Sequence, residues 1–115
     1  MSLTNHNLSY ADAVIAASGQ TSSIVETQGR TPVKFYIPVS DSTAFTFSVS
    51  IDNGVTYATL TDTSNAAIGI TKTAAAAGVY TVGTQDFAGI THIKVVAGTA
   101  ETSGAITVQV GLMDV

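Results

Sequence analysis

Residues 44–57 read Ala-Phe-Thr-Phe-Ser-Val-Ser-Ile-Asp-Asn-Gly-Val-Thr-Tyr, and this stretch decides the fold class. Apolar side chains alternate with Thr and Ser over residues 45–51, which is the period of a β-strand with one buried face. Asp52-Asn53-Gly54 then marks a turn, because glycine takes a positive φ without steric cost. The stretch therefore predicts a β-hairpin.

The hydrophobic pattern also predicts the length of the hairpin loop. A two-residue loop would place Val49 opposite Ala58, whereas a three-residue loop places Val49 opposite Tyr57. The three-residue loop keeps the large apolar side chains together on one face of the hairpin. We therefore expect the three-residue loop, with Gly54 in the left-handed conformation.

The rest of the chain continues this pattern of short apolar runs separated by turns rich in Gly, Ser, Thr and Asp. We expect strands within residues 12–17, 23–28, 33–37, 66–73, 79–82, 90–96 and 105–112, besides the hairpin. Ala74 to Ala77 is too short to hold an isolated helix, so we expect a turn there. We expect a core that contains Phe47, Val49, Ile93, Val95, Ile106 and Val108.

These elements predict an all-β protein with a single antiparallel β-sandwich, either jelly-roll or Ig-like, of about eight short strands. Residues 1–10 are polar and lack periodicity, so we interpret them as an extended N-terminal arm. The β-sandwich domain then covers residues 11–115. Leu3 and Tyr10 are the large apolar side chains of this arm, and they are our candidates for contact with a partner.

Composition excludes several classes of function. The chain carries a net charge of −4 with only four Lys and Arg residues, too few to neutralise a run of phosphates, so we expect no nucleic-acid partner. The sequence contains no basic amphipathic segment and no long apolar segment, so we expect no membrane partner. Charged residues make up only 10% of the chain. A surface so poor in charge repels its neighbours weakly and suits a protein that packs against other subunits or forms a symmetric array.

The sequence also lacks the usual constellations of a catalytic site. It contains no cysteine, which excludes thiolate metal sites and a cysteine nucleophile. His6 falls in the arm and His92 in a strand, and neither accompanies a nucleophile motif. We therefore predict that the protein is not an enzyme and needs no cofactor.

Two weaker binding sites remain as alternatives. Asp52, Asn53 and Asp62 are candidates for a Ca²⁺ site at one end of the sandwich, although they lack the spacing of a calcium loop. The four tyrosines are candidates for a sugar-stacking platform, although partly buried strand positions with the hydroxyl at the rim explain Tyr57 and Tyr80 better. They are Tyr10, Tyr36, Tyr57 and Tyr80.

The order of the motifs resembles a known group of proteins. A Lys-Phe-Tyr-Ile-Pro strand at 34–38 is followed by the hairpin at 45–57, by Gly-Val-Tyr at 78–80 and by Phe-Ala-Gly-Ile-Thr-His-Ile-Lys-Val at 87–95. This order is similar to that of small β-sandwich virion proteins of tailed bacteriophages, in which Asp-Gly-Gly is common where Asp52-Asn53-Gly54 stands here. The motif residues are structural, so the resemblance carries over no functional site.

The resemblance implies a capsid (head) decoration protein on the outer surface of a virion. Its partner would be the major capsid protein, and it would stabilise the capsid by bridging neighbouring capsid subunits. The alternative is a carbohydrate- or receptor-binding β-sandwich module of a phage tail or fibre, or of a secreted protein.

Overall fold

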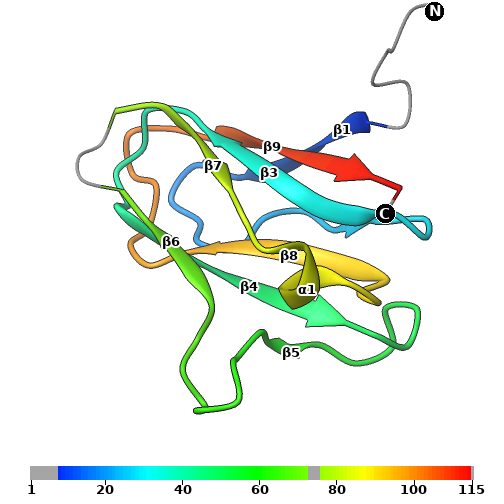
Figure 1. Ribbon diagram of the computed structural model, residues 1–115. Coiled ribbons are helices and arrows are strands. Elements are labelled where there is room, and N and C mark those ends of the chain that lie inside the picture. The colour runs from blue at the N-terminus through cyan, green and yellow to red at the C-terminus, as the bar shows by residue number, and fades with distance from the viewer. Residues whose placement is uncertain (1–7, 73–75, 115) are drawn as a thin grey trace, which may run out of the picture.

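The computed structural model describes residues 8–72 and 76–114 and confirms the predicted antiparallel β-sandwich. Two sheets pack face to face, as Figure 1 shows. The elements are β1 (Leu8–Ile15), β2 (Val25–Glu26), β3 (Thr31–Ile37), β4 (Ala44–Ser50), β5 (Ala58–Thr59), β6 (Gly69–Thr71), β7 (Gly78–Thr81), α1 (Thr84–Phe87), β8 (His92–Ala97) and β9 (Ile106–Met113). None of the helices within these described ranges has the length and apolar content that crossing a bilayer requires.

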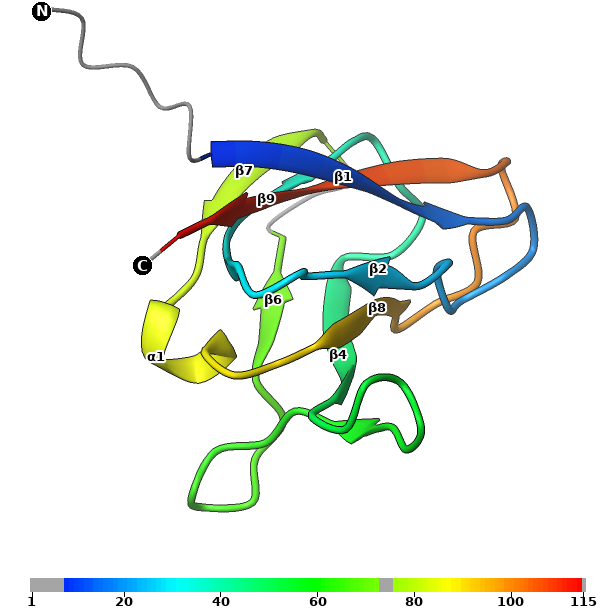
Figure 2. The same ribbon diagram turned by 90° about the vertical axis from the view of Figure 1, so that its right-hand side faces the viewer.

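The strand order identifies the sandwich as a jelly roll. One sheet has the order β1-β9-β3-β7, and the other has the order β2-β8-β4-β5, with β6 also paired to β4. The chain thus passes from one sheet to the other at most of its connections, with β4, β5 and β6 in the same sheet (Figure 2). The first strand pairs with the last, and the second pairs with the last but one, which is the arrangement of a jelly roll rather than of an Ig domain.

Three phenylalanines join the two sheets at the centre of the core. Phe35 comes from β3 in the first sheet, Phe47 from β4 in the second, and Phe87 from α1. Their ring centroids lie 4.8, 5.2 and 5.7 Å apart, and all three side chains are buried. These separations suit tilted and edge-to-face aromatic packing. Each sheet is therefore anchored to the other and to α1.

The predicted core is confirmed except at one position. Phe47, Ile93, Val95, Ile106 and Val108 are buried, and Val49 is half-buried against the edge of the core. In β8 the predicted alternation holds, because Ile93 and Val95 point inward while His92 and Lys94 are partly exposed. The four-residue helix α1 occupies a segment where the sequence predicted only a turn and the lead into the following strand.

The predicted register of the central hairpin is wrong. Val49 pairs with Ala58 rather than with Tyr57, and Ser48 pairs with Thr59. The strands are separated by a wide loop, not by a three-residue turn. Ile51 and Val55, which the hydrophobic pattern placed on the buried face, lie in this loop and are 77% and 78% exposed.

Hydrogen bonds to polar side chains fix the conformation of this loop. The hydroxyls of Ser50 and Thr56 and the backbone N–H of Thr56 all donate to the Asp52 carboxylate. The N–H of Gly54 donates to Ser50 Oγ, and Asn53 and Gly54 both adopt positive φ, at 61° and 84°. The carboxylate thus closes a local turn. This turn leaves no room for the tighter pairing that would bury the apolar side chains.

The predicted boundary of the N-terminal arm is also wrong at residues 8–10. These residues form the first part of β1 and pair with residues 111–113 of β9. Tyr10 is therefore a strand residue. Arg30 reinforces this end of the strand, since its guanidinium donates to Ser9 Oγ. Residues 1–7 and the predicted turn residues 73–75 lie outside the described residues.

We predict that Phe47→Ala lowers the free energy of unfolding by about 3–5 kcal/mol, because it removes the central ring of the aromatic cluster and leaves a cavity between the sheets. Urea denaturation followed by tyrosine fluorescence and far-UV circular dichroism measures the change. Val55→Ala, in the exposed loop, is the control and is expected to change stability by less than about 0.5 kcal/mol. Equal effects of the two substitutions would contradict the described core.

Candidate functional site

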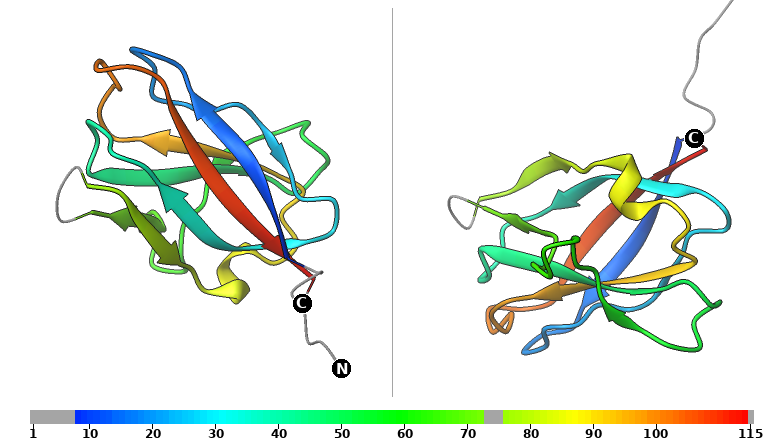
Figure 3. Two further views of the ribbon diagram at one scale, coloured as in Figure 1. Left: turned by 90° about the horizontal axis from the view of Figure 1, so that it is seen from above. Right: turned by 60° about the horizontal axis from the view of Figure 1, so that its bottom comes forward.

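The outer face of the β1-β9-β3-β7 sheet is the most apolar exposed surface of the described residues. Paired residues of neighbouring strands share one face, so the register defines two rows across this sheet. One row runs Tyr10, Gly111, Lys34, Thr81, and the next runs Asp12, Gln109, Tyr36, Val79. Figure 3 (left) shows the strands that carry them side by side.

This outer face carries five of the nine exposed large hydrophobic residues found among residues 8–72 and 76–114. They are Tyr10, Val14, Tyr36, Val79 and Met113. Val79 is 64% exposed and Tyr10 is 56% exposed, so both side chains are largely accessible to solvent. Apolar groups clustered on one face mark an interaction surface more often than scattered ones do. We call this set of five residues the sheet face.

Gly111 shapes the sheet face next to Tyr10. A Cβ at position 111 would lie 3.1 Å from a ring carbon of Tyr10 and 3.4 Å from Cβ of Lys34. The tyrosine ring therefore lies against the backbone of β9, in space that a side chain would fill. The absence of a side chain at Gly111 thus lets the ring lie over β9.

The outer face of the second sheet is more polar, although Val96 also lies on it. It carries Ser48 and Lys94 in neighbouring strands, and the Lys94 ammonium lies 4.1 Å from the centre of the Tyr57 ring. His92 Nε2 lies 3.9 Å from a carboxylate oxygen of Glu26, which occupies the adjacent strand. The two sheets of the sandwich thus differ in the chemistry of their outer faces.

The structure divides the four tyrosines of the predicted sugar platform. Tyr10 and Tyr36 both lie on the sheet face. Their register and ideal strand spacing place their Cα atoms at a separation of roughly 12 Å. Tyr57 lies against the other sheet, and Tyr80 points inward and packs against the core. Of the two predicted partner contacts, Tyr10 belongs to the sheet face and Leu3 lies outside the described residues.

Asp52 and Asp62, the two acids proposed as Ca²⁺ ligands, each accept hydrogen bonds from residues of their own turns. The carboxylate of Asp62 accepts the N–H groups of Ser64 and Ala66, while that of Asp52 is held by Ser50 and Thr56 as described above. The three hydrogen bonds from Ser50 and Thr56 hold the pKa of Asp52 well below its usual value. Within the described ranges, no three His, Asp or Glu side chains come together as metal ligands.

His92 lies beside a hydroxyl, but the hydroxyl is not arranged as a nucleophile. His92 Nδ1 is 3.1 Å from Thr91 Oγ1. That oxygen donates its proton to the carbonyl of Ser50 and accepts the N–H of Asn53. A general base needs the hydroxyl proton to be directed at its own nitrogen. The absence of enzymatic activity remains a prediction.

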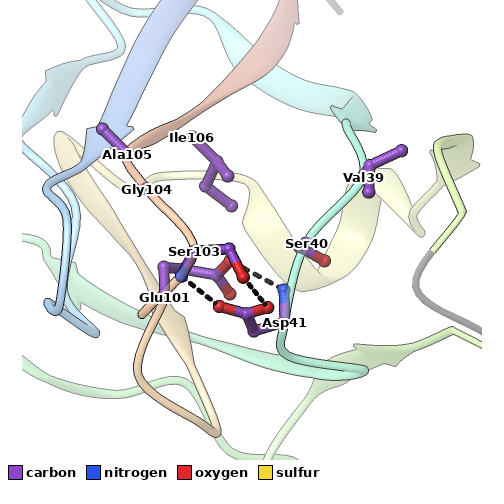
Figure 4. Close-up of a pocket in the computed structure, with 8 residues that line it drawn as sticks. All are labelled: Val39, Ser40, Asp41, Glu101, Ser103, Gly104, Ala105 and Ile106. Carbon is purple, nitrogen blue, oxygen red and sulfur yellow. Dashed lines mark hydrogen bonds between the residues drawn. The ribbon is translucent and has the colours of Figure 1, made fainter.

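A cavity of about 240 Å³ opens at the end of the sandwich where residues 38–42 meet residues 99–106. Figure 4 shows the two carboxylates at its edge. Glu101, only 1% exposed, accepts the N–H groups of Asp41 and Ser42 at 2.8 and 3.0 Å. Asp41 in turn accepts the N–H and hydroxyl of Ser103, and these bonds lower the pKa of Asp41.

Lys72 is the buried cation of the same network. Its ammonium donates to the carbonyl of Pro38 at 3.1 Å and to Ser40 Oγ at 2.6 Å. Burial lowers the pKa of Lys72, and the negative charge of Glu101 opposes that shift. Sequence reasoning identified neither Lys72 nor Glu101. Since both carboxylates accept several hydrogen bonds from the fold, we interpret this network as a clamp that joins two loops rather than as a reactive site.

No protein-family model and no curated protein matches the sequence. Solved structures with a similar fold include a mitogen from Yersinia pseudotuberculosis, at 13% identity and a TM-score of 0.39, with 93% of this chain and 85% of that chain covered. A CBM32 module from a Clostridium perfringens family 31 glycoside hydrolase aligns at 13% identity and a TM-score of 0.48, covering 94% and 78%. A chitosan-binding module from Paenibacillus sp. IK-5 aligns at 14% identity and a TM-score of 0.45, covering 88% and 75%. At such identities the likeness does not assign a ligand to this chain.

We predict that Glu101→Ala lowers the free energy of unfolding by about 3–5 kcal/mol, because the buried N–H of Ser42, the part-buried N–H of Asp41 and the Lys72 ammonium all lose the buried carboxylate. Glu101→Gln is expected to cost less, since its amide oxygen still accepts a hydrogen bond. Urea denaturation at neutral pH compares the two variants. A loss below about 1 kcal/mol for Glu101→Ala would show that the loops hold together without the clamp.

We also predict that the protein loses stability as the pH falls below about 4. The pKa values of Asp41 and Asp52 are lower in the folded chain than in the unfolded chain. Their stabilising effect is therefore present above the unfolded pKa and is lost as the pH falls through the folded pKa. Urea midpoints measured from pH 7 to pH 2 test this. The double variant Asp41→Asn, Asp52→Asn should be less stable at neutral pH and less sensitive to acid.

Proposed function

We propose that the chain is a non-catalytic β-sandwich binding module that attaches to a larger surface through the sheet face. The observation that carries this proposal is the difference between the two outer faces of the sandwich. One face exposes two tyrosines, two valines and a methionine, while the other carries mainly Ser, Thr, His and Lys side chains besides Val96. A stable monomer has no need for such a one-sided cluster of exposed apolar groups.

The composition of the sheet face favours a protein surface as the partner. Tyrosine and methionine are enriched where proteins meet one another, and charged residues are depleted from the centre of such contacts. Val14, Val79 and Met113 present aliphatic groups that match apolar side chains better than they match hydrated sugar hydroxyls. Two charged residues of opposite sign, Lys34 and Asp12, lie on the face as well, one in each of the two rows.

The finer proposal is decoration of a bacteriophage capsid, with the major capsid protein as the surface that is bound. Its support is the resemblance of the sequence to small virion proteins, together with the low charge of the chain. Viral capsid domains and lectin domains both use the jelly-roll architecture, so the fold by itself favours neither class. One small face gives weak binding, and an array of copies on a capsid would convert many weak contacts into stable attachment.

A second candidate function, polysaccharide binding, rests on the two tyrosines of the sheet face. Tyr10 and Tyr36 lie in neighbouring rows, with the amide of Gln109 on the strand between them and the carboxylate of Asp12 beside Tyr10 on β1. Exposed rings separated by polar side chains can stack on sugar rings while the polar groups bond to hydroxyls. In this case the protein would act as a receptor- or carbohydrate-binding module.

We predict that the double variant Tyr36→Ser, Val79→Ser binds its partner at least about tenfold more weakly, because it removes two neighbouring exposed side chains from the sheet face. Two assays identify the partner: co-sedimentation with purified phage heads assembled without this protein, and retardation in gels that contain soluble polysaccharides. Binding to heads supports decoration, and retardation by a polysaccharide supports the second candidate.

The matched control is the double variant Ile51→Ser, Val55→Ser, which removes two apolar side chains that are even more exposed, from the loop between β4 and β5. Both double variants should retain the unfolding midpoint of the original protein, since neither touches the core. If the control loses binding while the sheet-face variant keeps it, the binding surface is the loop, and the proposal is wrong.

A further inference from the structure

Strand β1 has an open edge along its first five residues. β1 is the outermost strand of its sheet and pairs with β9 on one side only, as Figure 2 shows. Near the C-terminal end of β1, the backbone N–H and C=O of Val14 point to the side away from β9. Its carbonyl accepts the N–H of Ser23 at 2.9 Å, and its N–H donates to Ser23 Oγ at 3.0 Å. The edge is therefore closed at Val14 but not before it.

The regular register of β1 identifies which groups remain open. Backbone N–H and C=O groups of successive strand residues point to opposite edges, and β1 pairs with β9 without a bulge from residue 8 to residue 15. Since Val14 points to the open edge, so do Asp12, Tyr10 and Leu8. Within the described residues, none of these three has a backbone partner on that side.

Most of the usual protections of an edge strand are missing here. Natural edge strands avoid pairing through charged side chains, above all lysine, and through proline, bulges or an inward-pointing charge. Residues 8–12 read Leu-Ser-Tyr-Ala-Asp and contain no lysine or proline. Ser9 and Ala11 point toward the core side and are small, while the single charge, Asp12, lies on the outer face. Such an edge can accept another strand.

We infer that this edge pairs with the same edge of a second copy, in an antiparallel register that places Tyr10 opposite Tyr10 of the second copy. Tyr10 is the midpoint of the open segment, so this register uses all of residues 8–12 in both copies and stops before Val14. It places Leu8 opposite Asp12 in both directions. Each of the three pairs joins residues whose backbone groups face the open edge, as antiparallel pairing requires.

The Asp12 carboxylates and the Tyr10 rings favour the register that is centred on Tyr10. A register centred on Asp12 would set two carboxylates directly opposite each other and would place Tyr10 against Val14, whose backbone groups are already bonded. The register centred on Tyr10 separates the carboxylates and opposes two exposed aromatic rings, a favourable cross-strand pair. The contact is symmetric about a two-fold axis beside Tyr10.

The size of the contact predicts weak association. Five residues extend over roughly 17 Å of strand, and this edge alone buries much less than the about 800 Å² per partner of a stable complex. The dimer should therefore form at high local concentration and dissociate on dilution. It would join the two β1-β9-β3-β7 sheets into one and bring the two sheet faces side by side. This pairing is independent of what the sheet face binds.

Sedimentation velocity over a concentration series up to the millimolar range tests the pairing. Asp12→Pro removes an N–H from the open edge in both copies, at a position where an edge strand tolerates proline. Asp12→Ala is the matched control, because it removes the same carboxylate but keeps the N–H. We expect a concentration-dependent dimer for the original protein and for Asp12→Ala, and at least about tenfold weaker association for Asp12→Pro.

A cysteine pair tests the register, since the chain contains no cysteine of its own. Tyr10→Cys should form a disulfide-linked dimer under mild oxidation, because opposed residues of an antiparallel pair lie within disulfide reach. Asp12→Cys should remain monomeric, because its counterpart in the second copy lies roughly four residues away along the strand, beyond that reach. Equal cross-linking of both variants, or a monomer at every concentration, would overturn the inference. Loss of binding to phage heads or to a polysaccharide would not overturn the inference, because such a result concerns the sheet face and not the edge of β1.

Discussion

The contact between Phe35, Phe47 and Phe87 is the constraint on which the rest of the structure depends. It joins β3, β4 and α1, three elements from different parts of the chain, at the point where the two sheets face each other. Once these rings fix the inward faces of β3 and β4, the period of two assigns every neighbouring side chain to the core or to solvent. The sheet face is thus a consequence of the core, because Tyr36 points outward only while Phe35 points inward.

The sequence predicted the core better than it predicted the connections. Burial of Ile93, Val95 and Val108 follows from alternation, which is a local property of each strand. The hairpin register was missed because the hydrophobic pattern ignores what polar side chains do, and the carboxylate of Asp52 gathers the loop into a different turn. The start of β1 was missed because Ser9 and Ala11 give its inward face too little apolar character to reveal a strand.

The site was predictable only in part, because its members come from four strands. Tyr10 stands out in the sequence as an apolar residue within a polar segment. Its grouping with Tyr36 and Val79 depends on the order β1-β9-β3-β7, which no local pattern contains. The same is true of the clamp, since Lys72 and Glu101 lie far apart in the sequence and meet only where two loops cross the end of the sandwich. Non-local strand order is what sequence patterns represent least well.

Tyr10 connects the two surfaces of this protein. Its side chain belongs to the sheet face, whereas its backbone N–H and C=O belong to the open edge, so a single residue can serve both surfaces with different groups. The low charge of the chain keeps repulsion between copies small, and a shared sheet would orient two faces in the same direction. A partner with regularly repeated sites would then engage two faces at once, and each weak contact would strengthen the other through effective concentration. Weak pairing suits such a role better than a permanent dimer, because the spacing of the sites, rather than the free protein, then decides where copies assemble.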